Sequence, residues 1–182
     1  MTEELIPAVD PDSLEDVYPD PELVRTTIDA LRNEVLAAED VIDELRARGE
    51  LVGLLRATGE LDAALVEAER ATDRADIAGN GAQQHTARAR LARVHQARGD
   101  FAQANLTYTE LLAEAERFGP VIEAFTLQYA GLNDFAQGHW ADAAAHFAKA
   151  AAIRDELELD EAERAASRVA LAAARRRLEE NA

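Results

Sequence analysis

The chain has 182 residues, of which 48% are hydrophobic and only 5% aromatic, enough apolar material for one compact domain or one short repeat array. It contains no cysteine, which excludes disulfide bridges, thiolate zinc sites and cysteine nucleophiles. The formal net charge of −17 disfavours nucleic acids and anionic membranes as partners, because both attract basic surfaces.

The first 20 residues form an acidic tail in this interpretation. Residues 1–22 hold eight acidic residues and no basic one, whereas a secretory signal needs basic residues followed by an apolar run. Pro7, Pro11 and Pro19 interrupt any helix here. No stretch approaches the roughly 20 apolar residues that span a bilayer. We therefore expect a cytoplasmic protein with a proline-containing tail at 1–20 and a helical repeat domain at 21–182.

A helical pattern begins at Pro21, a residue suited to a first helical turn, with Asp20 as its N-cap. Apolar residues then recur at steps of three and four. This first stretch is expected to end near Gly49 or to break around Ala38. The helices are expected at about 21–48, 50–57, 60–78, 82–98, 101–118, 120–137, 140–157 and 160–180.

The middle of the chain repeats itself. Gly59, Gly99 and Gly138 stand 40 and 39 residues apart, a large apolar residue follows each glycine by two positions, and an alanine follows each by five. A fixed period in this range is typical of stacked helical repeats. Each glycine is expected to end one helix in a left-handed cap, and each alanine to let two helix backbones approach. Each unit is then a pair of antiparallel helices joined by a short turn.

The motif Gly-Asp-Phe-x-x-Ala at 99–104, with its equivalents at 59 and 138, resembles the turn and second-helix start of a tetratricopeptide repeat. Ala130-Gly131 resembles the small pair on the first helix of that repeat, and the period matches the subclass of roughly 40 residues. The resemblance covers about residues 45–182. It implies an all-α, right-handed superhelical array of antiparallel helix pairs, with about three repeats, an N-terminal helix and a C-terminal capping helix.

Residues for catalysis or cofactor binding do not form recognisable motifs. The four histidines include no pair at i, i+4 spacing, and no glycine-rich phosphate loop is present. Neither serine lies in a nucleophile elbow. We therefore expect no enzyme activity, no cofactor and no metal.

The resemblance also implies a concave face lined by the first helix of each pair. Counting back from each turn glycine predicts polar and apolar groove residues, and extending the period predicts two more on the last helix. The candidate binding residues are Arg46, Arg56, Arg93, Gln96, Phe125, Gln128, Leu132, Phe135, Arg168 and Arg175. Every charged member is an arginine, whose planar fork suits carboxylates. The arginines could instead only cover alanine-rich helices with their aliphatic stems. The run Arg175–Arg177 is either a set of last-turn cations that offset the helix dipole or an anion contact.

The first hypothesis is an adaptor that binds a polypeptide, acidic with apolar anchors, in this groove. Residues 1–21 combine acids with apolar residues, so the chain's own tail is a candidate occupant, in the same chain or a neighbouring one. The alternative is a structural subunit that forms a homo-oligomer, such as a homodimer, through its terminal helices without binding peptides. Neither hypothesis involves nucleic acid or a membrane.

Overall fold

The computed structural model describes residues 7–181, which divide into two compact units. The first unit comprises residues 7–10 and 15–98, and the second comprises residues 11–14 and 99–181. Eight α-helices account for most of the described residues. The prediction of an all-α array of helix pairs is therefore confirmed.

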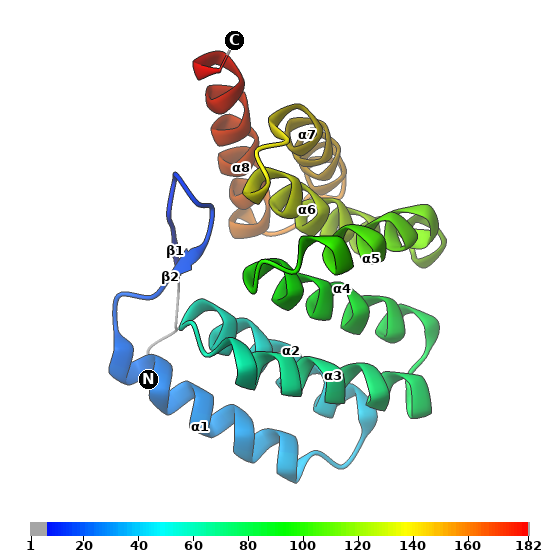
Figure 1. Cartoon of the computed structure of the whole chain (residues 1–182). Coiled ribbons are helices and arrows are strands. Elements are labelled where there is room, and N and C mark those ends of the chain that lie inside the picture. The colour runs from blue at the N-terminus through cyan, green and yellow to red at the C-terminus, as the bar shows by residue number, and fades with distance from the viewer. Residues whose placement is uncertain (1–6, 182) are drawn as a thin grey trace. The chain divides into compact units, whose positions relative to one another are not determined.

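The first unit contains four helices that pack in chain order. They are α1 (Pro21–Ala37), α2 (Val41–Ala57), α3 (Leu61–Ala78) and α4 (Gly81–Ala97), and Figure 1 shows them side by side. Their core joins larger apolar side chains of α1 and α2 to small ones of α3. It includes Val24, Ile28, Leu31, Leu51, Leu55, Ala64, Ala68 and Val94. The buried alanines let α3 pack closely on its neighbours, as the repeat pattern predicted.

The first predicted helical stretch is two helices, so the expected ranges 21–48 and 50–57 were wrong. The break lies at the alternative position, since Ala38 adopts an extended backbone after α1. Asp40 then caps α2, and its side chain accepts hydrogen bonds from the backbone N–H groups of Ile42 and Asp43 at 2.8 and 2.9 Å. Gly49 lies inside α2 and not at a helix end. The guanidinium of Arg90 occupies the space that a Cβ on Gly49 would need.

The turn glycines act as the spacing predicted. Gly59 has a φ of 79°, and the N–H of Glu60 donates to the carbonyl of Leu55 at 2.8 Å, which closes α2 with a Schellman motif. Gly138 has a φ of 77°, and His139 closes its helix in the same way. A side chain at these φ values is strained, so each glycine fixes where a new helix begins.

The tail forms a short hairpin. Its strands β1 (Ala8–Val9) and β2 (Asp16–Val17) are antiparallel, with Ala8 opposite Val17. The N–H of Asp10 donates to the carbonyl of Glu15 at 2.9 Å. Residues 11–13 form a turn, and they belong with Leu14 to the second unit. The predicted tail, 1–20, is thus ordered from residue 7, and its residues 1–6 lie outside the described part of the chain.

The second unit contains α5 (Phe101–Glu114), a 3₁₀ turn (Ala115–Phe118), α6 (Pro120–Ala136), α7 (Trp140–Glu156) and α8 (Glu161–Glu180). Helices α6, α7 and α8 pack successively on one another. A Cβ on Gly131 would lie 2.6 Å from the ring of Phe147, so glycine lets that fully buried ring rest on the backbone of α6. This contact explains the small pair at 130–131 that the sequence analysis singled out.

Candidate functional site

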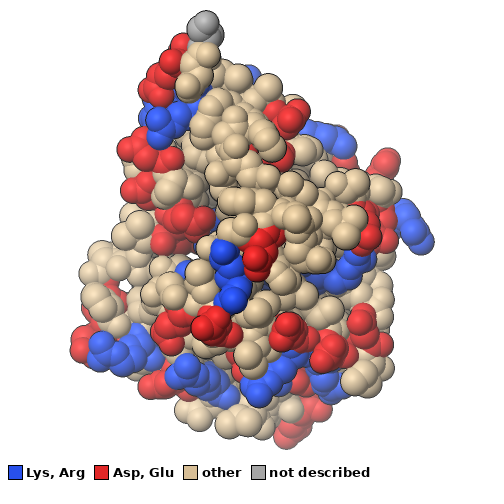
Figure 2. Space-filling model, viewed as in Figure 1, with Lys and Arg blue, Asp and Glu red and all other residues tan. Residues whose placement is uncertain are grey.

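Two of the predicted arginines lie close together in the first unit. Arg56 is on α2 and Arg93 on α4, two helices that pack against each other. Their side chains are only 8% and 5% exposed. Figure 2 shows acidic and basic side chains interspersed over the helices of the first unit, α1 to α3, in the lower part of the view. The buried arginine pair differs from those exposed charges, because a buried charge needs a partner.

That partner is the tail. Arg93 Nη2 donates to Glu15 Oε1 at 2.9 Å, and Arg56 Nη1 donates to the other oxygen of the same carboxylate. Arg56 Nη2 donates to Asp16 Oδ2 at 3.0 Å. Gln96, also a predicted site residue, accepts a hydrogen bond from Arg93 Nη1 through its Oε1. One carboxylate therefore receives two guanidinium groups, and a side-chain amide orients one of them.

The pKa of Glu15 reports this environment. Burial raises the pKa, but the charges of Arg93 and Arg56 and their hydrogen bonds together lower it below the ordinary value of 4.5. A carboxyl whose pKa is lower in the folded than in the unfolded chain stabilises the fold above the unfolded value. That stabilisation is lost as the pH falls from about 4.5 through the lower folded pKa. The contact between the tail and the arginine pair should therefore be an acid-sensitive one.

The second unit binds the tail through Leu14. This side chain is 4% exposed and packs against Phe135, Phe147 and small residues of α7 and α8. Two predicted groove residues, Leu132 and Phe135, belong to this cluster. Phe135 also packs edge-on against Trp140, with ring centroids 4.9 Å apart. We call the residues around Leu14 the leucine pocket: Leu132, Phe135, Trp140, Ala143, Ala144, Phe147, Ala170, Leu171, Ala173 and Ala174.

Two arginines of α8 contact the tail beside the leucine pocket. Arg176 Nη2 donates to the carbonyl of Pro11 at 2.9 Å and to Asp12 Oδ1 at 3.1 Å, and Arg177 Nη2 reaches the same oxygen at 3.3 Å. Of the two readings of the run 175–177, the anion contact thus describes Arg176 and Arg177. Arg175, the predicted groove residue of this run, is exposed.

Favourable and unfavourable contributions of similar size determine the free energy with which residues 11–14 bind to the helices. Burying a leucine stabilises by about 1.5–3 kcal/mol. The φ of Leu14 is 60°, and a left-handed backbone costs a residue with a Cβ about 1–2 kcal/mol. Exposed ion pairs such as those of Asp12, whose side chain is 73% exposed, add about 0–1 kcal/mol each. The segment is therefore bound by only a few kcal/mol.

The remaining predicted site residues lie elsewhere. Arg46 pairs with Glu34 and Glu50 on the exposed surface, and Arg168 pairs with Asp155 and Glu161. Phe125 stacks on Tyr129, with ring centroids 4.3 Å apart. Gln128 is buried and accepts a hydrogen bond from the hydroxyl of Ser167 at 2.7 Å. None of these contacts, among the residues described, involves the tail.

The sequence analysis missed a buried polar network. Arg154 Nη1 donates to Ser167 Oγ at 2.7 Å and to the carbonyl of Glu163 at 2.9 Å, which joins α7 to α8. Burial lowers the pKa of Arg154, although nearby acids raise it in part. The signal was present, because Arg154 continues the buried stripe of Phe147 and Ala150 at helical spacing.

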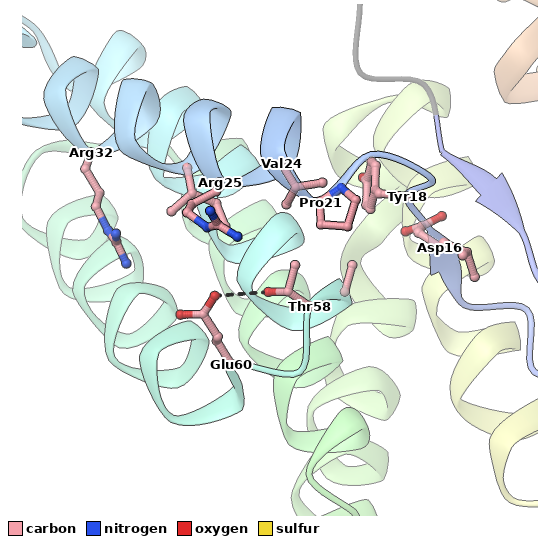
Figure 3. Close-up of a pocket in the computed structure, with 11 residues that line it drawn as sticks. Asp16, Tyr18, Pro21, Val24, Arg25, Arg32, Thr58 and Glu60 are labelled. Atoms are coloured by element: carbon pink, nitrogen blue, oxygen red, sulfur yellow. Dashed lines mark hydrogen bonds between the residues drawn. The ribbon is translucent and has the colours of Figure 1, made fainter.

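An open cleft of about 650 Å³ lies in the first unit where β2 meets the start of α1. Figure 3 shows Arg25 and Arg32 extending from α1 at the cleft and Tyr18 at its other end. Thr58 Oγ1 donates to Glu60 Oε1 at 3.3 Å on the facing wall. The lining mixes charges of both signs with apolar side chains, and its polar groups do not converge on one point. The cleft therefore does not indicate a specific ligand.

None of the described helices is long and apolar enough to cross a membrane. No group of three or more histidine, aspartate or glutamate side chains within residues 7–181 is placed to hold a metal ion.

Comparison with known proteins supports the fold. No protein-family model matches the chain, and no curated protein matches it in sequence. Among solved structures, it is similar to a crystal structure of nearly identical TPR-like repeats, assigned to a kinesin light chain of Podosopora anserina. The two share 18% sequence identity with a TM-score of 0.54, over 87% of this chain and 79% of the other. The chain therefore has the TPR-like repeat fold that the resemblance of its turn motifs implied.

Proposed function

We propose that this protein is a protein-interaction scaffold that binds an acidic polypeptide segment through Arg56 and Arg93. The acidic side chains of the tail contact these arginines in the same chain, which supports an acidic segment as the ligand. The observation that carries the proposal is the double contact of the Glu15 carboxylate with both guanidinium groups. The protein works by binding and not by catalysis.

The chemistry of the arginine pair supports this choice. Two cations that are almost fully buried lose much of their hydration, and they need an anion to compensate. Guanidinium groups bind carboxylates through directed, charge-assisted hydrogen bonds, each worth about 1.5–3 kcal/mol. Gln96 accepts a hydrogen bond from the Arg93 guanidinium and so orients it. The pair is thus organised for a carboxylate, and an acidic segment of a partner would compete with the tail for it.

A peptide titration tests the proposal. The receiver is the full chain carrying Glu15→Gln and Asp16→Asn, in which the tail's own acids no longer compete, and the probe is a fluorescent peptide of residues 8–18. We expect the peptide to bind, and Arg56→Glu or Arg93→Glu in the receiver to weaken it at least tenfold, or about 1.4 kcal/mol. Fluorescence anisotropy gives the affinity, and circular dichroism checks that helicity is retained.

The matched control is Arg117→Glu. Arg117 is exposed and forms no ion pair with the described residues, so this variant makes the same charge change away from the tail. Its peptide affinity should equal that of the parent receiver. Equal affinities for the Arg93→Glu and Arg117→Glu receivers would count against the arginine pair as the binding site.

A further inference from the structure

The leucine pocket has an unusual occupant. Leu14 contacts the cluster on α6, α7 and α8, yet the chain segment that carries it is a turn of the tail and no part of those helices. The helices pack successively on one another through their own buried residues, with the ring of Phe147 against Gly131 as their central contact. Leu14 therefore covers a surface that the helices form without it.

The backbone of the occupant is strained. Leu14 follows the turn at 11–13 with a φ of 60°, a conformation that glycine and asparagine favour and that a leucine adopts only under constraint. The constraint comes from the hairpin, which must return from β1 to β2 within a few residues. A segment supplied by another protein carries no such hairpin and can place a leucine in the pocket with an ordinary backbone.

The charges beside the pocket define the rest of the ligand. Arg176 and Arg177 both face the carboxylate of Asp12, two residues before Leu14, and Arg176 also binds the carbonyl of Pro11. This contact to the backbone fixes the direction of the segment, and the contact to the side chain selects an acid. The surface therefore matches an acidic residue followed two positions later by leucine.

We propose that the leucine pocket and the Arg176–Arg177 pair form a docking site for a partner segment of the type acid-x-leucine, which residues 11–14 occupy until it is displaced. This inference rests on the proposed function and adds the apolar anchor of the ligand. The tail competes from within the chain at a high effective concentration, so a partner must exceed it in affinity or in local concentration. Strain at Leu14 lowers the affinity that the partner has to exceed.

The test compares the full wild-type chain with its Leu14→Ser variant, using the fluorescent peptide of residues 8–18. The variant should bind the peptide at least tenfold more tightly than the wild type, because its own tail no longer fills the pocket. Adding Arg176→Glu and Arg177→Glu should remove this gain, whereas adding Arg117→Glu should keep it. A peptide with serine in place of its leucine should bind both chains equally weakly.

Three results would overturn the inference. One is equal affinity of the wild-type and Leu14→Ser chains for the peptide, with unchanged circular dichroism. Another is a gain that survives the two substitutions on α8. The third is a wild-type dimer in analytical ultracentrifugation that Leu14→Ser dissociates, since the pocket would then hold the tail of a second copy.

If the Leu14→Ser chain loses helicity, a chain that carries only Arg176→Glu and Arg177→Glu, two surface substitutions, replaces it in the test. The inference then requires the wild-type chain to bind the peptide more tightly than this variant does. If these outcomes fail while affinity still depends on Arg56 and Arg93, the proposed function stands without this second site.

Discussion

Replacing Phe147 by alanine is expected to lower the free energy of unfolding of the second unit by about 3–5 kcal/mol, as for other large aromatic residues in full cores. Phe147 is fully buried, lies against the backbone of α6 at Gly131 and is itself part of the leucine pocket. Trp140 is the chain's single tryptophan and belongs to the same unit, so its fluorescence in a urea titration reports this unfolding.

The companion substitution is Gly131→Ala. Its Cβ would lie 2.6 Å from the Phe147 ring, and we expect this overpacking to cost about 1–3 kcal/mol. In a Phe147→Ala chain the ring is gone, so the same Gly131→Ala substitution should be nearly neutral there. Additive effects of the two substitutions would show that glycine is not required by this ring.

Breaking the buried polar network between α7 and α8 should also lower the free energy of unfolding. Ser167→Ala removes an acceptor of the Arg154 guanidinium and the hydroxyl donor to Gln128. Each buried group left without its partner costs about 1–3 kcal/mol, and a charged group costs more. We expect a matching loss in the same fluorescence-monitored urea titration.

Arg154→Met separates the cost of the charge from the cost of lost packing. Methionine keeps most of the side-chain volume and has no charge to solvate, and such replacements of buried ions are often neutral or stabilising. In a Ser167→Ala chain, Arg154→Met should therefore restore much of the lost stability. A double variant that is less stable than Ser167→Ala alone would mean that the packing of Arg154 and its hydrogen bond to the carbonyl of Glu163 outweigh the cost of burying its charge.

Local chemistry made much of the fold predictable. Gly59, Gly99 and Gly138 fix the turns, because only glycine adopts their positive φ without strain, and they are spaced at the repeat period. The alanine five residues after each glycine is fully buried, as close helix packing requires. The exception is the break between α1 and α2, after Ala37. No glycine or proline separates these two helices, and only the capping by Asp40 marks the boundary.

The site was less predictable, since its contacts join residues far apart in the sequence. Counting from the glycines, as the resemblance to tetratricopeptide repeats implies, gave Arg56, Arg93 and Gln96 as groove residues. The structure joins Arg93 to Gln96 and both arginines to Glu15. The composition of the tail suggested that it could be a ligand but not that Glu15 and Leu14 would be the contacting residues. On α8 no glycine fixes the register, and counting selected Arg175 as the site residue. The alternative of an anion contact by the run 175–177 describes Arg176 and Arg177, which contact the tail.

The proposed function requires the Glu15 carboxylate to lie between Arg56 and Arg93 in solution. An NMR titration of the Glu15 side-chain carboxyl carbon in the full chain measures this. We expect a midpoint below the ordinary 4.5, and a return toward that value in an Arg56→Gln and Arg93→Gln chain, where both cations are gone. A wild-type midpoint at or above 4.5, unaffected by the two substitutions, would contradict it.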